Sequence, residues 1–383
     1  MNILFLDQSG KLGGAELSLL DLAIFYQQNA LVGLFADGTF RQQLEQYKIP
    51  VEVLTQKSIN ISKDSNLIQG LSSSFSLIPL LVNIIKLAQN YDLIYANTQK
   101  AFVMGAIASF LSHRPLVYHL RDIISDEHFS AANQRIITTL ANQFASLVIA
   151  NSQATQRSFI EAGGRPELTT VVYNGFEVKH YQSHPLGRNR RRKELGLEQQ
   201  FVIGHFSRLS PWKGQHILLE ALAHCPDNIT AIFVGDALFG EQEYVKQLHQ
   251  KVAELGLEKR VKFLGFQSDV VSFMNACDLI AHTSTAPEPF GRVIIEAMLC
   301  QRPVIATAAG GVIELVKEGK TGWLVEPGNV QQLTEAIINC WQNPQLATQV
   351  AQQAQQEACE RFQLNRIQQQ IDRLLHQVLS EKG

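Results

Sequence analysis

Two glutamates bracket the stretch of this 383-residue chain with the most chemical content, Glu288-Pro-Phe-Gly-Arg-Val-Ile-Ile-Glu296. Prolines hold the chain extended ahead of a predicted helix, which begins at Phe290 and Gly291. The first amides of a helix have no partner within it, so they can receive a phosphate or a sugar hydroxyl. A single glutamate at a helix start usually only complements the helix dipole.

A second turn of the same kind follows the apolar run RPVIAT. Gly310 and Gly311 open another predicted helix there, with Glu314 just inside it. Two carboxylates placed by two separate anion-binding turns favour a site for phosphates and sugars over plain dipole complementation.

Arg208 and Lys213 flank the turn SRLSPWKG, directly after the predicted strand FVIGHF. Ligands of open α/β sheets bind at the carboxyl ends of the strands, where this turn must lie. The Arg208 guanidinium offers several hydrogen-bond donors in a fixed plane, and the Lys213 ammonium is a compact positive charge. This combination suits a diphosphate leaving group, whose negative charge rises as it departs. Two basic residues are more often a solvated surface pair, but here the position favours binding.

The first predicted strand, MNILFLD, also runs into a glycine turn. Gly13 and Gly14 open the next helix, so that backbone amides can approach an anion or a sugar closely. The turn lacks the GxGxxG fingerprint, and most such turns are plain connectors. His119 ends the predicted strand PLVYHL, and such a histidine is more often a core or surface residue than a catalytic one.

The elements that would position these residues alternate along the whole chain. Apolar strand-like runs are separated by segments of helical length: MNILFLD, ALVGLFA, VEVL, YDLIYA, PLVYHL, SLVIA and TTVVY in the first half, and FVIGHF, TAIFVG, VKFLG, DLIAHTS, RPVIAT and GWLV in the second. This alternation is typical of parallel sheets with crossover helices. The sequence therefore predicts an α/β protein with two Rossmann-like, doubly wound domains.

The alternation stops where prolines, glycines and the basic run RNRRRKE occur. We therefore expect a first domain at 1–180, a linker at 181–200 and a second domain at 201–360. Apolar residues spaced by three and four positions predict helices in the tail, including 361–383. The basic run could dock an anionic membrane, although a solvated linker helix is the commoner explanation. The apolar segment Phe75 to Ala88 fits either membrane contact or core packing.

Composition excludes several classes of protein. The 33 Lys plus Arg are balanced by 35 Asp plus Glu, so no global cationic field exists to collect nucleic acid. Five scattered cysteines without a CxxC pair argue against disulfides or a zinc site, and no Asp-x-Asp strand end offers ligands for a divalent cation. No apolar run reaches the roughly 20 residues that span a bilayer. Without a signal-peptide pattern, we expect a cytoplasmic protein, with peripheral contact at the inner membrane face left open.

Taken together, these motifs resemble those of glycosyltransferase family 4, the retaining, nucleotide-sugar-dependent group 1 enzymes. Glu288 to Glu296 match the family's E-x7-E signature, and the GG-x-x-E and E-G-x-x-G-x-L-V segments follow in register. SRLSPWKG is similar to its R-x4-K-G turn, GGAE to its N-terminal glycine loop and VVYNG to its strand before the linker. The resemblance covers essentially the whole chain and implies the GT-B fold, two domains facing a cleft with the C-terminal helix crossing back to the first domain.

The resemblance also implies a role for each matching residue. Arg208 and Lys213 would hold the donor diphosphate, and Glu296 would receive the ribose hydroxyls. Glu288 and the amides of Phe290 and Gly291 would bind hydroxyls of the transferred sugar. In the first domain, His119 would lie near that sugar, and the loop at Gly13 and Gly14 would close on the phosphates. The usual His-Asp pair is replaced by His119-Leu-Arg121-Asp122, which leaves open whether Arg121 or Asp122 enters the site.

These roles predict a hexosyltransferase that acts on a glycan, lipid-linked or small-molecule acceptor in cell-surface polysaccharide or glycolipid synthesis. A nucleotide-diphosphate sugar would be its co-substrate, and we expect neither a metal nor another cofactor. A phosphorylase or a nucleotide-sugar epimerase on the same fold remains an alternative. So does a two-lobed sugar-binding protein without catalysis.

Overall fold

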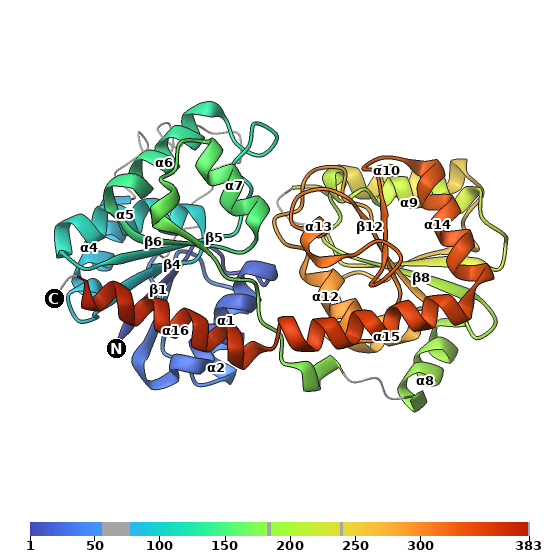
Figure 1. The fold of residues 1–383 in the computed structure, drawn as a ribbon, viewed down its shortest axis with the longest axis horizontal. Coiled ribbons are helices and arrows are strands. Elements are labelled where there is room, and N and C mark those ends of the chain that lie inside the picture. Colours follow the sequence, from blue (N-terminus) through green and yellow to red (C-terminus); the bar gives the residue numbers. More distant parts are fainter. Residues whose placement is uncertain (56–76, 182–184, 238–239, 382–383) are drawn as a thin grey trace. The chain divides into compact units, whose positions relative to one another are not determined.

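The computed structural model describes residues 1–55, 77–181, 185–237 and 240–381. Its internal contacts divide the chain into two compact units (Figure 1). Unit 1 comprises Met1–Gly175 and Leu364–Gly383, and unit 2 comprises Phe176–Gln363.

Unit 1 is built on a seven-stranded parallel sheet with the strand order β3-β2-β1-β4-β5-β6-β7. The strands are β1 (Ile3–Asp7), β2 (Ala30–Leu34), β3 (Val51–Val53), β4 (Leu93–Ala96), β5 (Leu116–Leu120), β6 (Ala145–Ala150) and β7 (Thr169–Val171). The helices are α1 (Gly14–Tyr26), α2 (Thr39–Gln46), α4 (Leu77–Ala88), α5 (Gln99–Ser112), α6 (Ala131–Phe144), α7 (Gln153–Glu161) and α16 (Leu364–Ser380).

Helices cover both faces of this sheet, which explains why its central strands are apolar throughout. Successive residues of β1 enter different cores because side chains of a strand alternate between the two faces. Leu4 and Leu6 join the core under α4 and α5. Ile3 and Phe5 join the core under α1 and α16.

The last helix of the chain, α16, belongs to unit 1. Its buried residues Ile367, Ile371 and Leu375 lie in the same core as Ile3 and Phe5, and the helix lies beside α1 (Figure 1). The return of the final helix to the first domain, which the family resemblance implies, therefore occurs in this fold.

Unit 2 repeats the architecture with a six-stranded parallel sheet in the order β10-β9-β8-β11-β12-β13. The strands are β8 (Phe201–Phe206), β9 (Ile229–Val234), β10 (Val261–Phe263), β11 (Leu279–His282), β12 (Val304–Thr307) and β13 (Trp323–Val325). The helices are α8 (Pro185–Leu195), α9 (Gln215–Ala223), α10 (Gln242–Glu254), α11 (Val270–Ala276), α12 (Arg292–Leu299), α13 (Val312–Leu315), α14 (Val330–Gln342) and α15 (Pro344–Arg361).

Each predicted strand forms, so the predicted fold class of two Rossmann-like, doubly wound parallel sheets is confirmed. In both sheets the strand order reverses beside the first strand, between β1 and β4 in unit 1 and between β8 and β11 in unit 2. Such a reversal opens a crevice outside the carboxyl ends of the two strands, where ligands of this fold class bind.

The stretch predicted as a linker holds helix α8, which packs on α11 of unit 2. Arg188 and Arg192 of the basic run form ion pairs with Asp278 at 2.5 and 2.9 Å. Arg192 also donates to the carbonyl of Ala276 at 2.9 Å, at the end of α11, where a helix carries partial negative charge. In this structure, unit 2 thus begins at Phe176, before the segment chosen from composition.

Helix α4 supports the core-packing interpretation of the apolar segment, whose residues 75 and 76 lie outside the described residues. Leu80, Ile84 and Ala88 are buried, whereas Ile78 and Val82 on the other side are exposed. None of the described helices is long and apolar enough to cross a bilayer.

Replacing Arg192 with Met should lower the free energy of unfolding of unit 2 by about 2 kcal/mol, because Asp278 and the carbonyl groups would lose a charged partner inside the fold. All three tryptophans lie in unit 2, so urea unfolding followed by tryptophan fluorescence reports on it. Arg190→Met is the matched control, since that side chain is 82% exposed. If both variants lost the same free energy of unfolding, the basic run would be a solvated surface segment and not part of the packed structure of unit 2.

Candidate functional site

The site in unit 2 begins where β8 and β11 end side by side. The turn after β8 touches the turn after β11 through backbone at Gly214, which has φ +68°, and a Cβ atom there would overlap the carbonyl oxygen of Thr283. His205, in β8, contacts both turns through its Nε2, which lies 3.0 Å from Thr283 Oγ1 and 3.3 Å from the Lys213 carbonyl oxygen. Burial lowers the pKa of His205 to about 3, so this residue is a neutral scaffold at physiological pH.

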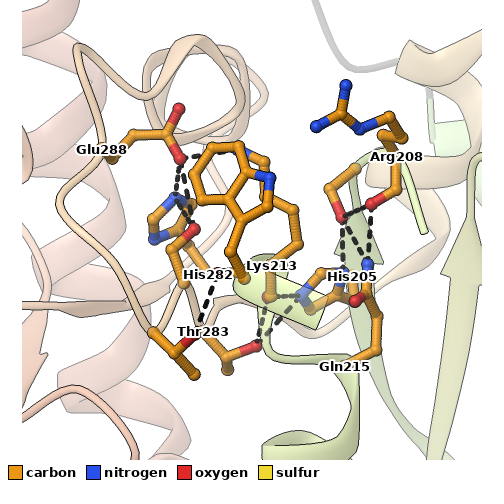
Figure 2. A network of polar contacts seen from close by, with 11 residues as sticks. His205, Arg208, Lys213, Gln215, His282, Thr283 and Glu288 are labelled. Atoms are coloured by element: carbon orange, nitrogen blue, oxygen red, sulfur yellow. Dashed lines mark hydrogen bonds and ion pairs between the residues drawn. The ribbon is translucent and has the colours of Figure 1, made fainter. Parts of the chain in front are cut away.

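Lys213 and Glu288, each predicted from the sequence, meet at this crevice. Lys213 Nζ lies 2.6 Å from Glu288 Oε2 (Figure 2). The same oxygen lies 3.2 Å from His282 Nε2 and accepts a hydrogen bond from Ser284 Oγ at 3.1 Å. Burial alone would raise the pKa of Glu288, but the Lys213 ammonium and the His282 hydrogen bond outweigh it and hold that pKa far below its ordinary value.

The two glycine turns predicted as separate binding elements are joined by backbone contacts. The Gly311 amide donates to the Glu288 carbonyl at 2.7 Å, and Gly310 pairs with Glu288 in a β-bridge. Gly310 has φ +66°, and a Cβ atom there would overlap the carbonyl oxygen of Glu288. The turn after β12 therefore fixes the backbone that carries the Glu288 carboxylate.

Arg208 lies on the same turn as Lys213 but has a different partner. Its Nε is 3.2 Å from Glu241 Oε2, close enough for an ion pair though not aligned as a hydrogen bond. In Figure 2 its guanidinium lies apart from the hydrogen bonds drawn around His205 and Gln215. Trp212 adds a further contact to Lys213, whose Nζ lies 3.9 Å from the centre of the indole ring. The two predicted phosphate-binding cations thus have separate partners, a carboxylate for each.

Helix α12 separates the surroundings of Glu296 from those of Glu288. Gly291 caps the helix with φ +96°, and the Phe290 ring is buried. Glu296 Oε1 lies 3.5 Å from Arg292 Nε, and Tyr181 is a second partner. Burial raises the pKa of Glu296 even though Arg292 opposes the shift. The two glutamates of the signature therefore differ in partners and in electrostatic environment.

Unit 1 carries a buried polar network at its own strand reversal. Asp7 ends β1, Asn97 follows β4 and Arg121 follows β5. Asn97 Nδ2 donates to Asp7 Oδ2 at 2.6 Å, and Arg121 Nε donates to Asn97 Oδ1 at 2.7 Å. Arg121 Nη1 donates to Asn174 Oδ1 at 2.9 Å. His119 on β5 belongs to this network through its Nδ1, which lies 3.2 Å from Arg121 Nη2.

The glycine turn lies next to this network. Gly13 caps α1 and Gly14 is its first residue. A Cβ atom at Gly13 would lie 2.8 Å from Glu16 Oε2, so the turn closes tightly over that carboxyl group. Burial and the Asp7 carboxylate raise the pKa of Glu16 to about 8. Burial raises the pKa of Asp7 to about 6, although the hydrogen bond from Asn97 opposes the shift.

The substituted His-Asp motif has a clear outcome in the fold. Arg121 is buried in the network with His119, whereas Asp122 is exposed. Of the two residues left open by the sequence, Arg121 is the one that lies beside the histidine. Among the described residues, no group of three or more His, Cys, Asp and Glu side chains could hold a metal ion.

Comparison with known proteins decides the family. Residues 12–180 match the model described as Glycosyltransferase Family 4, and residues 187–357 match the model described as Glycosyl transferases group 1. A crystal structure of Anabaena HepE in complex with UDP-glucose superposes on this chain with a TM-score of 0.92. The two sequences are 57% identical, and the match covers 98% of this chain and 100% of the HepE chain. The chain belongs to the group 1, family 4 glycosyltransferases.

Two further relatives of this glycosyltransferase are more distant. Spore coat protein SA of Bacillus subtilis (strain 168) is 32% identical over 218 residues, which are 52% of this chain and 56% of that protein, so the match spans about half of the curated relative. The sucrose-phosphate synthase structure from Thermosynechococcus elongatus is 19% identical, with a TM-score of 0.84 over 99% of both chains. At that identity it supports the shared fold alone.

Several polar residues around the candidate site residues of each unit were not predicted from the sequence. His282 and Ser284 hydrogen-bond Glu288, and Tyr95, Asn97 and Asp7 surround His119 and Arg121. A signal for them exists, because they lie at or just after the ends of predicted strands. Without the strand order, that signal does not say which of them meet.

The pKa of Glu16 leads to a prediction of how the stability of unit 1 depends on pH. A carboxyl group with a raised pKa in the folded state holds its proton where the unfolded chain has released it, so the free energy of unfolding falls as pH rises toward 8. In wild type this group makes the free energy of unfolding fall by up to about 1.4 kcal/mol per pH unit, and Glu16→Gln should abolish that contribution. Hydrogen exchange of β1 and α1 amides, corrected for intrinsic rates, measures it. The exposed Glu161→Gln is the control, and an equal pH slope in wild type and Glu16→Gln would contradict the assignment.

Proposed function

We propose that this protein is a retaining hexosyltransferase that moves a sugar from a nucleotide-diphosphate sugar to a hydroxyl group of a glycan, lipid-linked or small-molecule acceptor. UDP-glucose is the first donor to consider, because a relative that is 57% identical over 98% of this chain binds it. We place the activity in the synthesis of cell-surface polysaccharide or glycolipid, in the cytoplasm or in peripheral contact with the inner membrane face.

The observation that carries the proposal is the meeting of Lys213 and Glu288 at the carboxyl ends of β8 and β11. A nucleoside diphosphate is a weak base, so its departure requires neutralisation of growing negative charge more than it requires a proton donor. Lys213 and Arg208 lie on one turn and supply that charge. The turn at Gly13 and Gly14 and the amides that open α12, at Phe290 and Gly291, add hydrogen-bond donors for phosphate and sugar oxygens.

Glu288 serves as a binder of the sugar and not as an acid. Because its pKa lies far below the ordinary value, it is ionised throughout the physiological range and has no proton to give. A glycosidase needs a carboxylic acid that protonates the leaving oxygen, so this environment argues against hydrolysis of glycosides. Glu296, whose partners are Arg292 and Tyr181, is assigned to the ribose hydroxyls, and His119 to the sugar.

The proposed step breaks the bond between the anomeric carbon and the diphosphate oxygen, and the electron pair leaves with the nucleoside diphosphate. The acceptor oxygen bonds to the same face of the anomeric carbon, which retains its configuration. The departing phosphate oxygen takes the acceptor's proton. Lys213 and Arg208 provide the positive charge in this scheme, so we expect it to proceed without a divalent cation.

Incubation with radiolabelled UDP-glucose in EDTA tests the proposal. Slow hydrolysis, or transfer to added acceptors with release of UDP, is the expected result. Turnover only with inorganic phosphate would identify a phosphorylase, and conversion of the labelled nucleotide sugar to its epimer would identify an epimerase. Saturable binding of UDP-glucose without hydrolysis or transfer to any acceptor would identify a sugar-binding protein without catalysis.

Lys213→Met should lower kcat by about 100-fold or more at saturating donor, because one contact to growing charge in the transition state is lost. The variant also leaves the Glu288 carboxylate buried without its cation, so stability will fall as well. The double variant Lys213→Met/Glu288→Gln separates the two effects: it should recover stability in urea unfolding but not turnover. If the double variant recovered turnover, the assignment of Lys213 to the donor phosphate would be wrong.

The two signature glutamates should differ in the ligand that each one recognises. Glu288→Gln should weaken UDP-glucose binding while leaving UDP binding close to wild type, and Glu296→Gln should weaken UDP and UDP-glucose alike. Loss of one hydrogen bond to a charged group corresponds to about a tenfold rise in Kd. Titration calorimetry with both ligands measures the four constants. If Glu288→Gln lost UDP affinity as severely as Glu296→Gln does, the two roles would have to be exchanged.

A further inference from the structure

The inner nitrogen of the His119 ring faces two hydrogen-bond donors. Tyr95 Oη lies 2.5 Å from His119 Nδ1, and Arg121 Nη2 lies 3.2 Å from the same atom. A guanidinium has no acceptor and stays charged, so it can contact Nδ1 favourably only if that nitrogen carries no proton. Burial raises the pKa of Tyr95, which therefore keeps the phenolic proton that it donates.

The other ring nitrogen must then carry the proton. A neutral imidazole has one N–H, and with Nδ1 as the acceptor it lies on Nε2. His119 is 3% exposed, and its Nε2 has no hydrogen-bond partner within the part of the chain that the structure describes. A buried N–H without a partner is costly, so an oriented, unused donor at the end of a sheet strand is an unusual feature for a residue that serves only packing.

We propose that Arg121 and Tyr95 are positioning residues that hold His119 as a neutral imidazole with Nε2–H as a hydrogen-bond donor for an acceptor oxygen of the bound nucleotide sugar. The ligand in this statement rests on the proposed function, whereas the protonation of the ring rests on the geometry of unit 1 alone. The donor is uncharged, so it can orient a hydroxyl or ring oxygen without adding positive charge.

The surroundings keep the ring in this state. Arg121 is fixed by hydrogen bonds to two amide oxygens, Asn97 Oδ1 and Asn174 Oδ1, which hold its guanidinium beside His119. The carboxyl groups on β1 and α1 also face Arg121. Burial and the Asp7 carboxylate raise the pKa of Glu16 to about 8, so Glu16 is largely protonated near neutral pH, whereas Asp7, with a pKa of about 6, is largely ionised and attracts the Arg121 guanidinium. Burial and the charge of Arg121 lower the pKa of His119 far below its ordinary value.

Nitrogen NMR of protein labelled with ¹⁵N-histidine tests the protonation directly, without any sugar. His119→Gln assigns the signal. We expect Nε2 to show the shift of a protonated nitrogen and Nδ1 that of an unprotonated one, unchanged from about pH 8 to about pH 5. A ring protonated on Nδ1, or on both nitrogens, at neutral pH would overturn the proposal.

Variants of the two positioning residues test the cause. Arg121→Met should raise the pH at which the ring takes up its second proton by about one unit or more. Adding Tyr95→Phe should also remove the preference for one tautomer. Arg157→Met, at an exposed position on α7 of the same unit, is the matched control. Because Arg121 is buried, Arg121→Lys serves where Arg121→Met fails to fold; a titration unchanged in every folded Arg121 variant would overturn the positioning role.

Kinetics with UDP-glucose then test what the proton is for. The amide nitrogen of Gln can occupy the place of Nε2, whereas that of Asn reaches only the place of Nδ1. His119→Gln should therefore keep about tenfold more kcat/KM than His119→Asn. Equal losses in both variants would overturn the role of Nε2–H. If the enzyme instead transfers no sugar at all, the proposed function fails, while the NMR result still decides the state of His119.

Discussion

The constraint on which the rest of the site depends is the partly buried ion pair between Lys213 and Glu288. Removing two charges from water costs several kcal/mol for each, and the attraction between them offsets this only where geometry is good and further hydrogen bonds are made. His282 and Ser284 supply such bonds to the carboxylate oxygen that faces Lys213. The backbone must therefore deliver four side chains to one point.

Glycines make that delivery possible. At Gly214 and Gly310 the backbone of one turn approaches a carbonyl of another so closely that no side chain could fit, and both have positive φ. These contacts join the turn after β8 to that after β11, and the turn before α12 to that after β12. The glycine motifs thus act first by rigidly positioning the charged residues, and any direct contact of their amides with a ligand comes in addition.

The sequence predicted each strand and the motif residues of the site, such as Lys213 and Glu288, because both follow from local patterns. It could not predict the partners. Lys213 and Glu288 lie 75 residues apart and meet only because β8 and β11 are neighbours in the sheet. The basic run before β8 was assigned to a linker because the alternation of strands and helices stops at its prolines, glycines and charges. Arg188 and Arg192 instead share Asp278, which no local pattern reveals.

Residues of one chemical type acquire opposite properties in these surroundings. Glu288 is more acidic than an ordinary glutamate because Lys213 and His282 outweigh its burial, whereas Glu16 is less acidic because burial and Asp7 act together. The surroundings of the cationic residue Arg121 matter in the same way. Two amide oxygens hold the Arg121 guanidinium beside His119, and burial together with this positive charge lowers the pKa of His119 far below its ordinary value. The sequence motifs show where these residues are in the chain, but their protonation states depend on the groups that the fold places around them. The protonation state in turn decides whether a carboxyl group or an imidazole can donate or accept a hydrogen bond.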